Sequence, residues 1–295
     1  MSSPETLSSR SSLLGACMLG ALMLVALLAS HLAPIDPFAT AGEPLQPPSL
    51  RWLFGTDDLG RDVYAGVVHG TATSLRIGLL AAAISATIGL LVGGFAGTRE
   101  GVVDQVLMRM TEFVQILPRF FLIVTVVSLF GSHLNLVVLV LALTMWPATA
   151  RVFRAQVRSG LTRDFVVAAR AAGSSDVRLL IRHVLPAATS VLAAELSYQV
   201  GGAILAEAGV SFLGLGDPAV VSWGALLGAA QNTVREAWWM ALFPGLALTM
   251  TVMACNLIAD GMAPPRLSSA PPRLKPSRAD GRPVAESPSR LARPV

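Results

Sequence analysis

The chain contains 295 residues, of which 53% are hydrophobic and only 14% are charged. Soluble proteins carry about 25% charged residues, so the composition argues against a soluble protein and indicates several membrane-spanning helices; the period-two alternation of a membrane barrel is not apparent. The net charge of +4 does not imply a nucleic acid partner, because the arginines fall mainly in predicted cytosolic loops and in the tail, as the positive-inside rule expects.

The first apolar run, residues 11–33, carries no Asp, Glu, Lys or Arg. Because about 20 apolar residues cross a bilayer, we predict a cytosolic segment at 1–12 and the first transmembrane helix at 13–33. A secretory signal peptide is the alternative, since the small residues at 26–30 would suit cleavage. The apolar run is, however, longer than a typical signal core.

A polar, Pro-rich loop at 34–73 follows, and we predict that it is extracytoplasmic. It contains the string GTDDLGRD at 55–62, in which the glycines allow tight turns and Asp57, Asp58 and Asp62 can cap turns or pair with Arg61. The aspartates lack the spacing of a calcium-binding hand, which argues against a metal loop.

The next three spans are predicted at 74–97, 113–130 and about 136–155, with a short cytosolic link at 98–112. Gly89, Gly93 and Gly97 stand four apart and form a flat stripe that lets another helix approach closely. That helix belongs either to the same chain or to a partner subunit. Pro118 is expected to kink the third span near one end.

An Arg-rich segment at 160–186 separates the fourth and fifth spans, and its excess of arginine marks the cytoplasmic side. We predict a short helix at 165–172 that ends at Gly173 in the left-handed region. Ser174 or Ser175 then caps a second short helix, and Pro186 breaks that helix before the next span.

The fifth span, 187–215, holds Glu195, Gln199 and Glu207 at membrane depth. Buried ionisable groups in a membrane are costly and face a cavity or the bundle interior. They are interpreted either as lining a translocation path or as forming hydrogen bonds between helices. The sixth span is predicted at 241–258, and the Pro-, Arg- and Ser-rich tail at 263–295 is expected to be disordered and cytosolic.

Four segments together resemble the permease subunits of bacterial binding-protein-dependent ABC importers. Ala168-Ala169, Gly173 and Leu185-Pro186 match the "EAA" coupling loop of that family, although Val167 stands where the family usually has Glu. The string GTDDLGRD, the segment EAGVSFLGLG at 207–216 with SWG at 222–224, and the last helix are similar to the dipeptide, oligopeptide and nickel group.

The resemblance implies an all-α polytopic membrane protein with six transmembrane helices and the type I ABC importer permease fold. The core would span 74–262, both termini would be cytoplasmic, and the protein would lie in the bacterial cell inner membrane. It also implies a role in coupling to an ATPase for residues of the Arg-rich segment: Asp164, Phe165, Ala168, Ala169, Arg170, Gly173, Leu185 and Pro186.

Partners follow from the same resemblance: a second homologous permease subunit, two cytoplasmic ATPase subunits, an extracytoplasmic solute-binding protein and membrane lipid. No cofactor is expected in this chain, because the Walker A pattern is absent and ATP would be bound by the ATPase subunits. No nucleophile elbow or zinc-binding helix motif occurs either, so an enzyme is not indicated.

The sequence also leaves open two other classes of membrane protein. A proton-coupled secondary transporter would use Glu195 and Glu207 and would need no ATPase, and a membrane scaffold would tolerate substitution of Ala169 and Gly173. The solute itself, a di- or oligopeptide or nickel, is not identified by the sequence.

Overall fold

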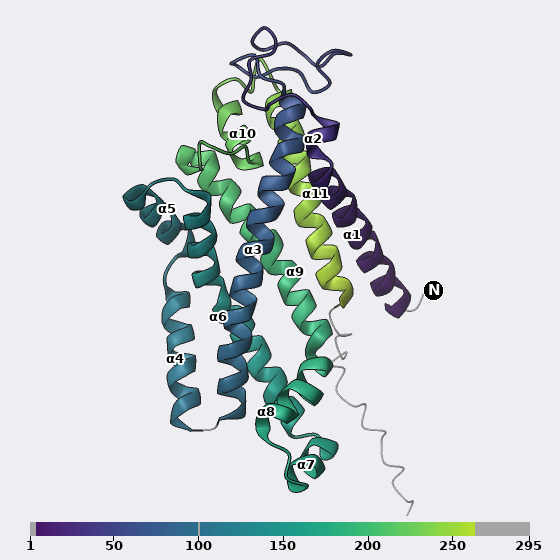
Figure 1. The fold of residues 1–295 in the computed structure, drawn as a ribbon, viewed down its shortest axis with the longest axis vertical. Coiled ribbons are helices and arrows are strands. Elements are labelled where there is room, and N and C mark those ends of the chain that lie inside the picture. Colours follow the sequence, from purple (N-terminus) through teal and green to yellow (C-terminus); the bar gives the residue numbers. More distant parts are fainter. Residues whose placement is uncertain (1–3, 100, 263–295) are drawn as a thin grey trace, which may run out of the picture. The chain divides into compact units, whose positions relative to one another are not determined.

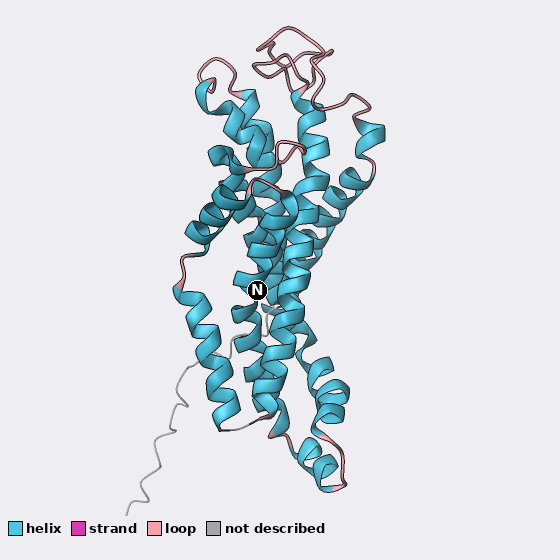
Figure 2. Ribbon diagram, turned by 60° about the vertical axis from the view of Figure 1, so that its left-hand side comes forward, coloured by secondary structure: helices cyan, strands magenta, loops and turns pink. Residues whose placement is uncertain are grey.

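The computed structural model describes residues 4–99 and 101–262, and the tail expected at 263–295 lies outside this part. Within the described part, every secondary-structure element is helical, apart from two isolated bridges in the loop before α3 (Figure 2). Among the described residues, five helices are long and apolar enough to cross a membrane, and up to six crossings result if one bent helix pair counts as a single span.

The chain begins with α1 (Pro4–Leu27) and the short α2 (Ala29–Leu32), so helical structure starts inside the segment expected to precede the first span. After a loop at 33–62, α3 (Val63–Thr98) runs for 36 residues and starts earlier than the predicted span. Asp62 explains this start, because its side chain accepts a hydrogen bond from Tyr64 N and caps the helix.

The predicted link at 98–112 and third span at 113–130 were wrong in their boundaries. Two helices, α4 (Val102–Ile116) and α5 (Arg119–Phe130), meet at an angle of 73° and qualify as a span only together. Pro118 causes the break, since a residue before proline is driven out of the helical region and Leu117 is extended (φ −70°, ψ 122°).

The second half of the chain contains three long helices and several short ones: α6 (Leu134–Leu161), α7 (Asp164–Ala171), α8 (Asp176–Leu179), η1 (Leu180–Val184), α9 (Leu185–Val210), η2 (Ser211–Leu215), α10 (Trp223–Ala229), η3 (Ala230–Asn232) and α11 (Trp239–Met262).

Pro186 does not break the helix in which it lies, contrary to the sequence-based prediction. The backbone stays helical from α8 through η1 into α9, with Pro186 in the first turn of α9. The π-helical turn η1 precedes the proline, and such local widening accommodates a residue that has no N–H to donate.

Helix α3 packs along α6 and α9, while α11 lies between α1 and α9 (Figure 1). The glycine stripe of α3 faces α6 of the same chain, which decides between the two readings of that stripe. A β-carbon at Gly89 would lie 2.6 Å from Thr149 Cβ, and one at Gly97 would lie 2.6 Å from Val157 Cβ. The stripe therefore serves close packing within the chain.

The connecting segments gather at two ends of the bundle. Trp239 Nε1 donates to Thr56 O (3.0 Å) and Asp217 Oδ2 accepts from Leu134 N (2.9 Å), which joins the segments 33–62, 131–133 and 216–238. We call this the tryptophan end. The turn between α3 and α4 lies with the α7–α8 loop around a shared cavity, and we call that side the arginine end.

Candidate functional site

The α7–α8 loop has the helix–turn–helix form that the sequence predicts. Helix α7 ends at Ala171, and Gly173 has φ +90°. Gly173 N donates to Arg170 O (3.0 Å) and Ser174 N donates to Ala169 O (3.1 Å), the paired bonds of a Schellman motif. Ser175 takes the cap position of α8, but its side chain makes no capping hydrogen bond.

One side of α7 is fixed to the bundle. Val166 is 1% exposed and lines a small cavity with Gly160 of α6 and Val184 of η1. Phe165 packs edge-on against the His183 ring, with centroids 5.7 Å apart. A side chain at Gly160 would collide with Val184, at 2.9 Å from its Cγ2. Helix α7 is therefore packed directly against the end of α6 and against the η1 turn that leads into α9.

The other side of α7 faces outward. Asp164, Phe165, Ala168 and Arg170 are exposed, and Ala169 is partly buried. Val167, at the position of the family's usual Glu, is also exposed (52%), as is Phe165 (52%). Two large apolar side chains on an exposed helix mark a surface suited to contact with another protein.

The remaining predicted coupling residues lie where the loop joins the bundle. Arg170 and Asp176 form a half-exposed ion pair (3.0 Å) across the turn at Gly173. Leu185 and Pro186 begin α9, directly after the turn that packs on α7. The structure thus brings the predicted coupling residues into one neighbourhood at the arginine end.

The predicted path residues do not form one group. Gln199 is buried, and its Nε2 donates to Thr149 Oγ1 of α6 (2.5 Å) and to Glu195 Oε1 (3.2 Å). Glu207 is 3% exposed, and its Oε1 accepts from Ser211 Oγ (2.6 Å) one turn further along. Among the described residues, Glu207 Oε2 has no hydrogen-bond partner. Hydrogen bonding within the described part of the chain therefore accounts for Gln199 Nε2 and for one oxygen of Glu207, whereas Gln199 Oε1 also has no partner there.

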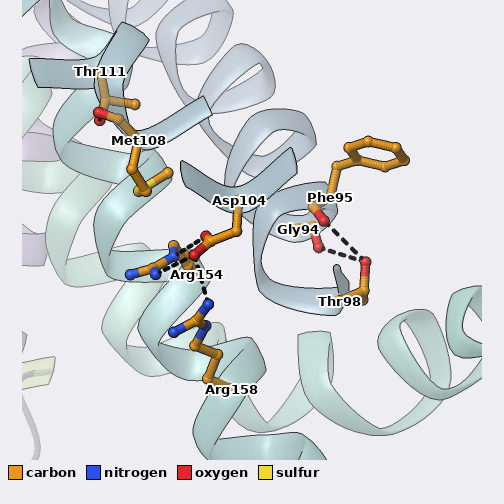
Figure 3. A network of polar contacts seen from close by, with 8 residues as sticks. All are labelled: Gly94, Phe95, Thr98, Asp104, Met108, Thr111, Arg154 and Arg158. Atoms are coloured by element: carbon orange, nitrogen blue, oxygen red, sulfur yellow. Dashed lines mark hydrogen bonds and ion pairs between the residues drawn. The ribbon is translucent and has the colours of Figure 1, made fainter. Parts of the chain in front are cut away.

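A charge cluster that sequence reasoning missed joins α4 to α6 (Figure 3). Asp104 accepts from Arg154 Nε (2.5 Å) and Nη2 (2.7 Å), and also from Arg158 Nη2 (2.7 Å). The Asp104 side chain is 9% exposed. A signal was present, because Arg154 and Arg158 stand four apart on one helix face, but nothing in the sequence placed Asp104 opposite them.

The Asp104 cluster adjoins the α7–α8 loop. A polar cavity of about 840 Å³ is lined by Asp104 and Arg158 on one side and by Arg170 and Asp176 on the other. The cluster and the loop therefore border the same space at the arginine end. Within 4–99 and 101–262, no group of His, Cys, Asp or Glu residues has the arrangement of a metal site.

Comparison with known proteins agrees with this architecture. Residues 89–264 match the family described as binding-protein-dependent transport system inner membrane component. A Brucella suis protein, named provisionally as a peptide transport system permease, is 39% identical over 250 residues (82% of this chain and 83% of the relative). The di/tripeptide transport system permease protein DppC of Pseudomonas aeruginosa is 36% identical over 249 residues (82% of each chain).

Proposed function

Because the chain belongs to the family of binding-protein-dependent transport system inner membrane components, we propose that it forms half of the transmembrane path of a di- or oligopeptide importer. It is an inner-membrane permease with the type I ABC permease fold, not an enzyme. The peptide assignment rests on the names of the relatives in Brucella suis and Pseudomonas aeruginosa. Neither nickel transport nor proton-coupled transport has support from these relatives.

The outward side of α7 is the observation that carries the coupling role. It presents Phe165 and Val167 beside Ala168, while Val166 anchors the helix from behind. We infer that this surface docks on an ATPase subunit, which would bind ATP in place of this chain. A complete importer would contain two such ATPases, a second homologous permease and an extracytoplasmic solute-binding protein.

The proposed orientation follows from charge. Arginines are concentrated at the arginine end, whereas acidic side chains outnumber basic ones at the tryptophan end. Under the positive-inside rule, the arginine end faces the cytosol. With six crossings both termini would be cytosolic, and the loop at 33–62 would be extracytoplasmic.

The proposed mechanism is alternating access driven by the ATPases. Closure of the ATPase pair moves α7, and the packing of Val166 near Gly160 and Val184 carries that movement to α6 and α9. ATP acts only if it binds the two states of the transporter with different affinity. Glu195, Gln199 and Glu207 keep their proposed place on the path, as polar groups of α9 between the two ends.

The test is ATP-driven uptake of a labelled dipeptide by the reconstituted importer, with Gly173→Asp as the probe of coupling. We expect wild-type uptake to require all partners and ATP. Gly173→Asp should retain ATP hydrolysis but lose most uptake, because a side chain at φ +90° strains the turn that orients α7.

Gly131→Asp is the matched control, since Gly131 has a similar φ of +93° but lies in the turn between α5 and α6 at the tryptophan end. It imposes comparable strain away from α7. Uptake without ATPase subunits would refute the importer assignment. Normal uptake by an assembled Gly173→Asp variant would refute the coupling role of the loop.

A further inference from the structure

A cavity of about 490 Å³ lies at the tryptophan end, between the loop that precedes α3 and the turn from η2 to α10. Phe38, Asp57 and Arg61 line one side, and Leu213 and Asp217 line the other. This volume falls in the range of about 300–1,000 Å³ that is typical of small-molecule sites. None of the roles described above uses this cavity.

Among the described residues that line this cavity, Arg61 is the one cation. Its guanidinium lies over the Phe38 ring, 5.6 Å from the ring centre. Its Nε is buried and has no hydrogen-bond partner among the residues that the structure describes. A guanidinium offers five donors in a planar fork that matches a carboxylate, so Arg61, which has a donor left without a hydrogen bond among the described residues, is equipped to bind a carboxylate.

Asp57 supplies the opposite charge. Its Oδ1 accepts from both Leu59 N (2.9 Å) and Arg61 N (2.7 Å), which fixes the carboxylate, and neither of these two bonds from the described residues uses Oδ2. Burial raises the pKa of Asp57 above its ordinary value, while the backbone N–H groups of Arg61 and Leu59 oppose that shift. A partly desolvated carboxylate gains more from a cationic partner than one in bulk water.

Asp62 and Asp217 also line the cavity, and both side chains accept hydrogen bonds from backbone N–H groups of the chain. Asp62 Oδ1 caps α3 through Tyr64 N. Asp217 accepts from Leu134 N through Oδ2 (2.9 Å) and from Ala219 N through Oδ1 (3.0 Å). Asp217 therefore fixes the turn that forms the far wall, and Asp57 is the carboxylate best placed to contact a ligand.

The charges of the residues that line the cavity indicate which kind of ligand it can bind. The described lining residues include three carboxylates and one guanidinium. A purely anionic ligand would therefore meet net repulsion, whereas a ligand with both charges satisfies Arg61 and Asp57 together. We propose that this cavity binds a small zwitterionic peptide, with Arg61 taking its C-terminal carboxylate and Asp57 its N-terminal ammonium. The choice of a peptide rests on the proposed function, and the site would add a solute contact on the permease itself.

The experiment is calorimetric titration of dialanine into the assembled importer, without its binding protein, in lipid nanodiscs. We expect saturable binding, and an affinity about tenfold or more lower for dialanine amide, because loss of the carboxylate removes a charge-assisted hydrogen bond. Arg61→Gln should weaken dialanine binding by a similar factor, and Asp57→Asn should weaken it as well.

Arg51→Gln is the matched control. Arg51 lies in the same loop and also sits over an aromatic ring, 5.3 Å from the centre of Trp52, but it does not line the cavity. Arg51→Gln should change the affinity for dialanine by no more than about twofold.

Three outcomes would overturn the proposal: no saturable binding, equal affinity for dialanine and its amide, or equal effects of Arg61→Gln and Arg51→Gln. The amide comparison uses the wild-type protein, so it does not depend on how a variant folds. ATP-driven uptake is measured separately, so an importer that transports peptides without this site would be recognised as such.

Discussion

A β-carbon at Gly93 of α3 would collide with the carbonyl oxygen of Ala150 on α6. Gly89 and Gly97 face α6 at similarly close range. The four-residue spacing predicted close helix packing correctly, because that spacing follows from helix geometry alone. The identity of the facing helix depends on the tertiary arrangement, which a spacing pattern does not contain.

Gly93→Ala should lower the free energy of unfolding by about 1–3 kcal/mol, since the extra methyl group forces α3 and α6 apart. Gly20→Ala is the control, because Gly20 lies in α1 with nothing within 4 Å of the added carbon; it should have no effect or a small stabilising one. The measurement is thermal unfolding in mild detergent, followed by tryptophan fluorescence. Equal melting temperatures for the two variants would contradict the close-packing account.

At the scale of elements, Asp104 holds α4 against α6 through Arg154 and Arg158. The sequence predicted a span where α6 lies and a kink at the proline between α4 and α5, but it placed Asp104 in a link rather than in a helix. The reason is physical: α4 carries charged and polar residues among its apolar ones, so its composition alone does not distinguish a loop from half of a bent span. The pairing of Asp104 with α6 became visible only in the folded chain.

Asp104→Asn should destabilise the chain by about 3 kcal/mol, because it leaves two guanidinium groups facing each other without the shared charge. Glu112→Gln provides the control on the same helix. Glu112 pairs with Arg109 (3.1 Å), but both side chains are more than half exposed, and such surface pairs contribute about 0–1 kcal/mol. A difference in melting temperature between the two variants tests the prediction, and similar values for both would show that Asp104 is not a structural clamp.

For the whole molecule, the segments between crossings alternate between the two ends. The loop at 33–62 contacts the start of α11 through Thr56 and Trp239, and Asp217 joins the segment 216–238 to Leu134 at the start of α6. The sequence predicted this alternation and the Arg-rich loop because hydropathy and charge act locally. It missed the uninterrupted helix through Pro186, since the π-helical turn η1, which lies against α6 and precedes the proline, leaves no pattern in the local sequence.

Because the connecting segments alternate between the two ends of the bundle, cysteine labelling can test which end faces the cytosol. With Cys17 and Cys255 replaced by alanine, Leu50→Cys and Ser175→Cys place single thiols at opposite ends. Leu50 is fully exposed at the tryptophan end, and Ser175 is exposed in the α7–α8 loop. The arginine excess around Ser175 favours the cytosolic side, so a membrane-impermeant maleimide should label only Leu50→Cys in spheroplasts and only Ser175→Cys in inside-out vesicles. The reverse pattern would place α7 outside the cell, where no ATPase subunit could reach it, and would refute ATP coupling through this loop.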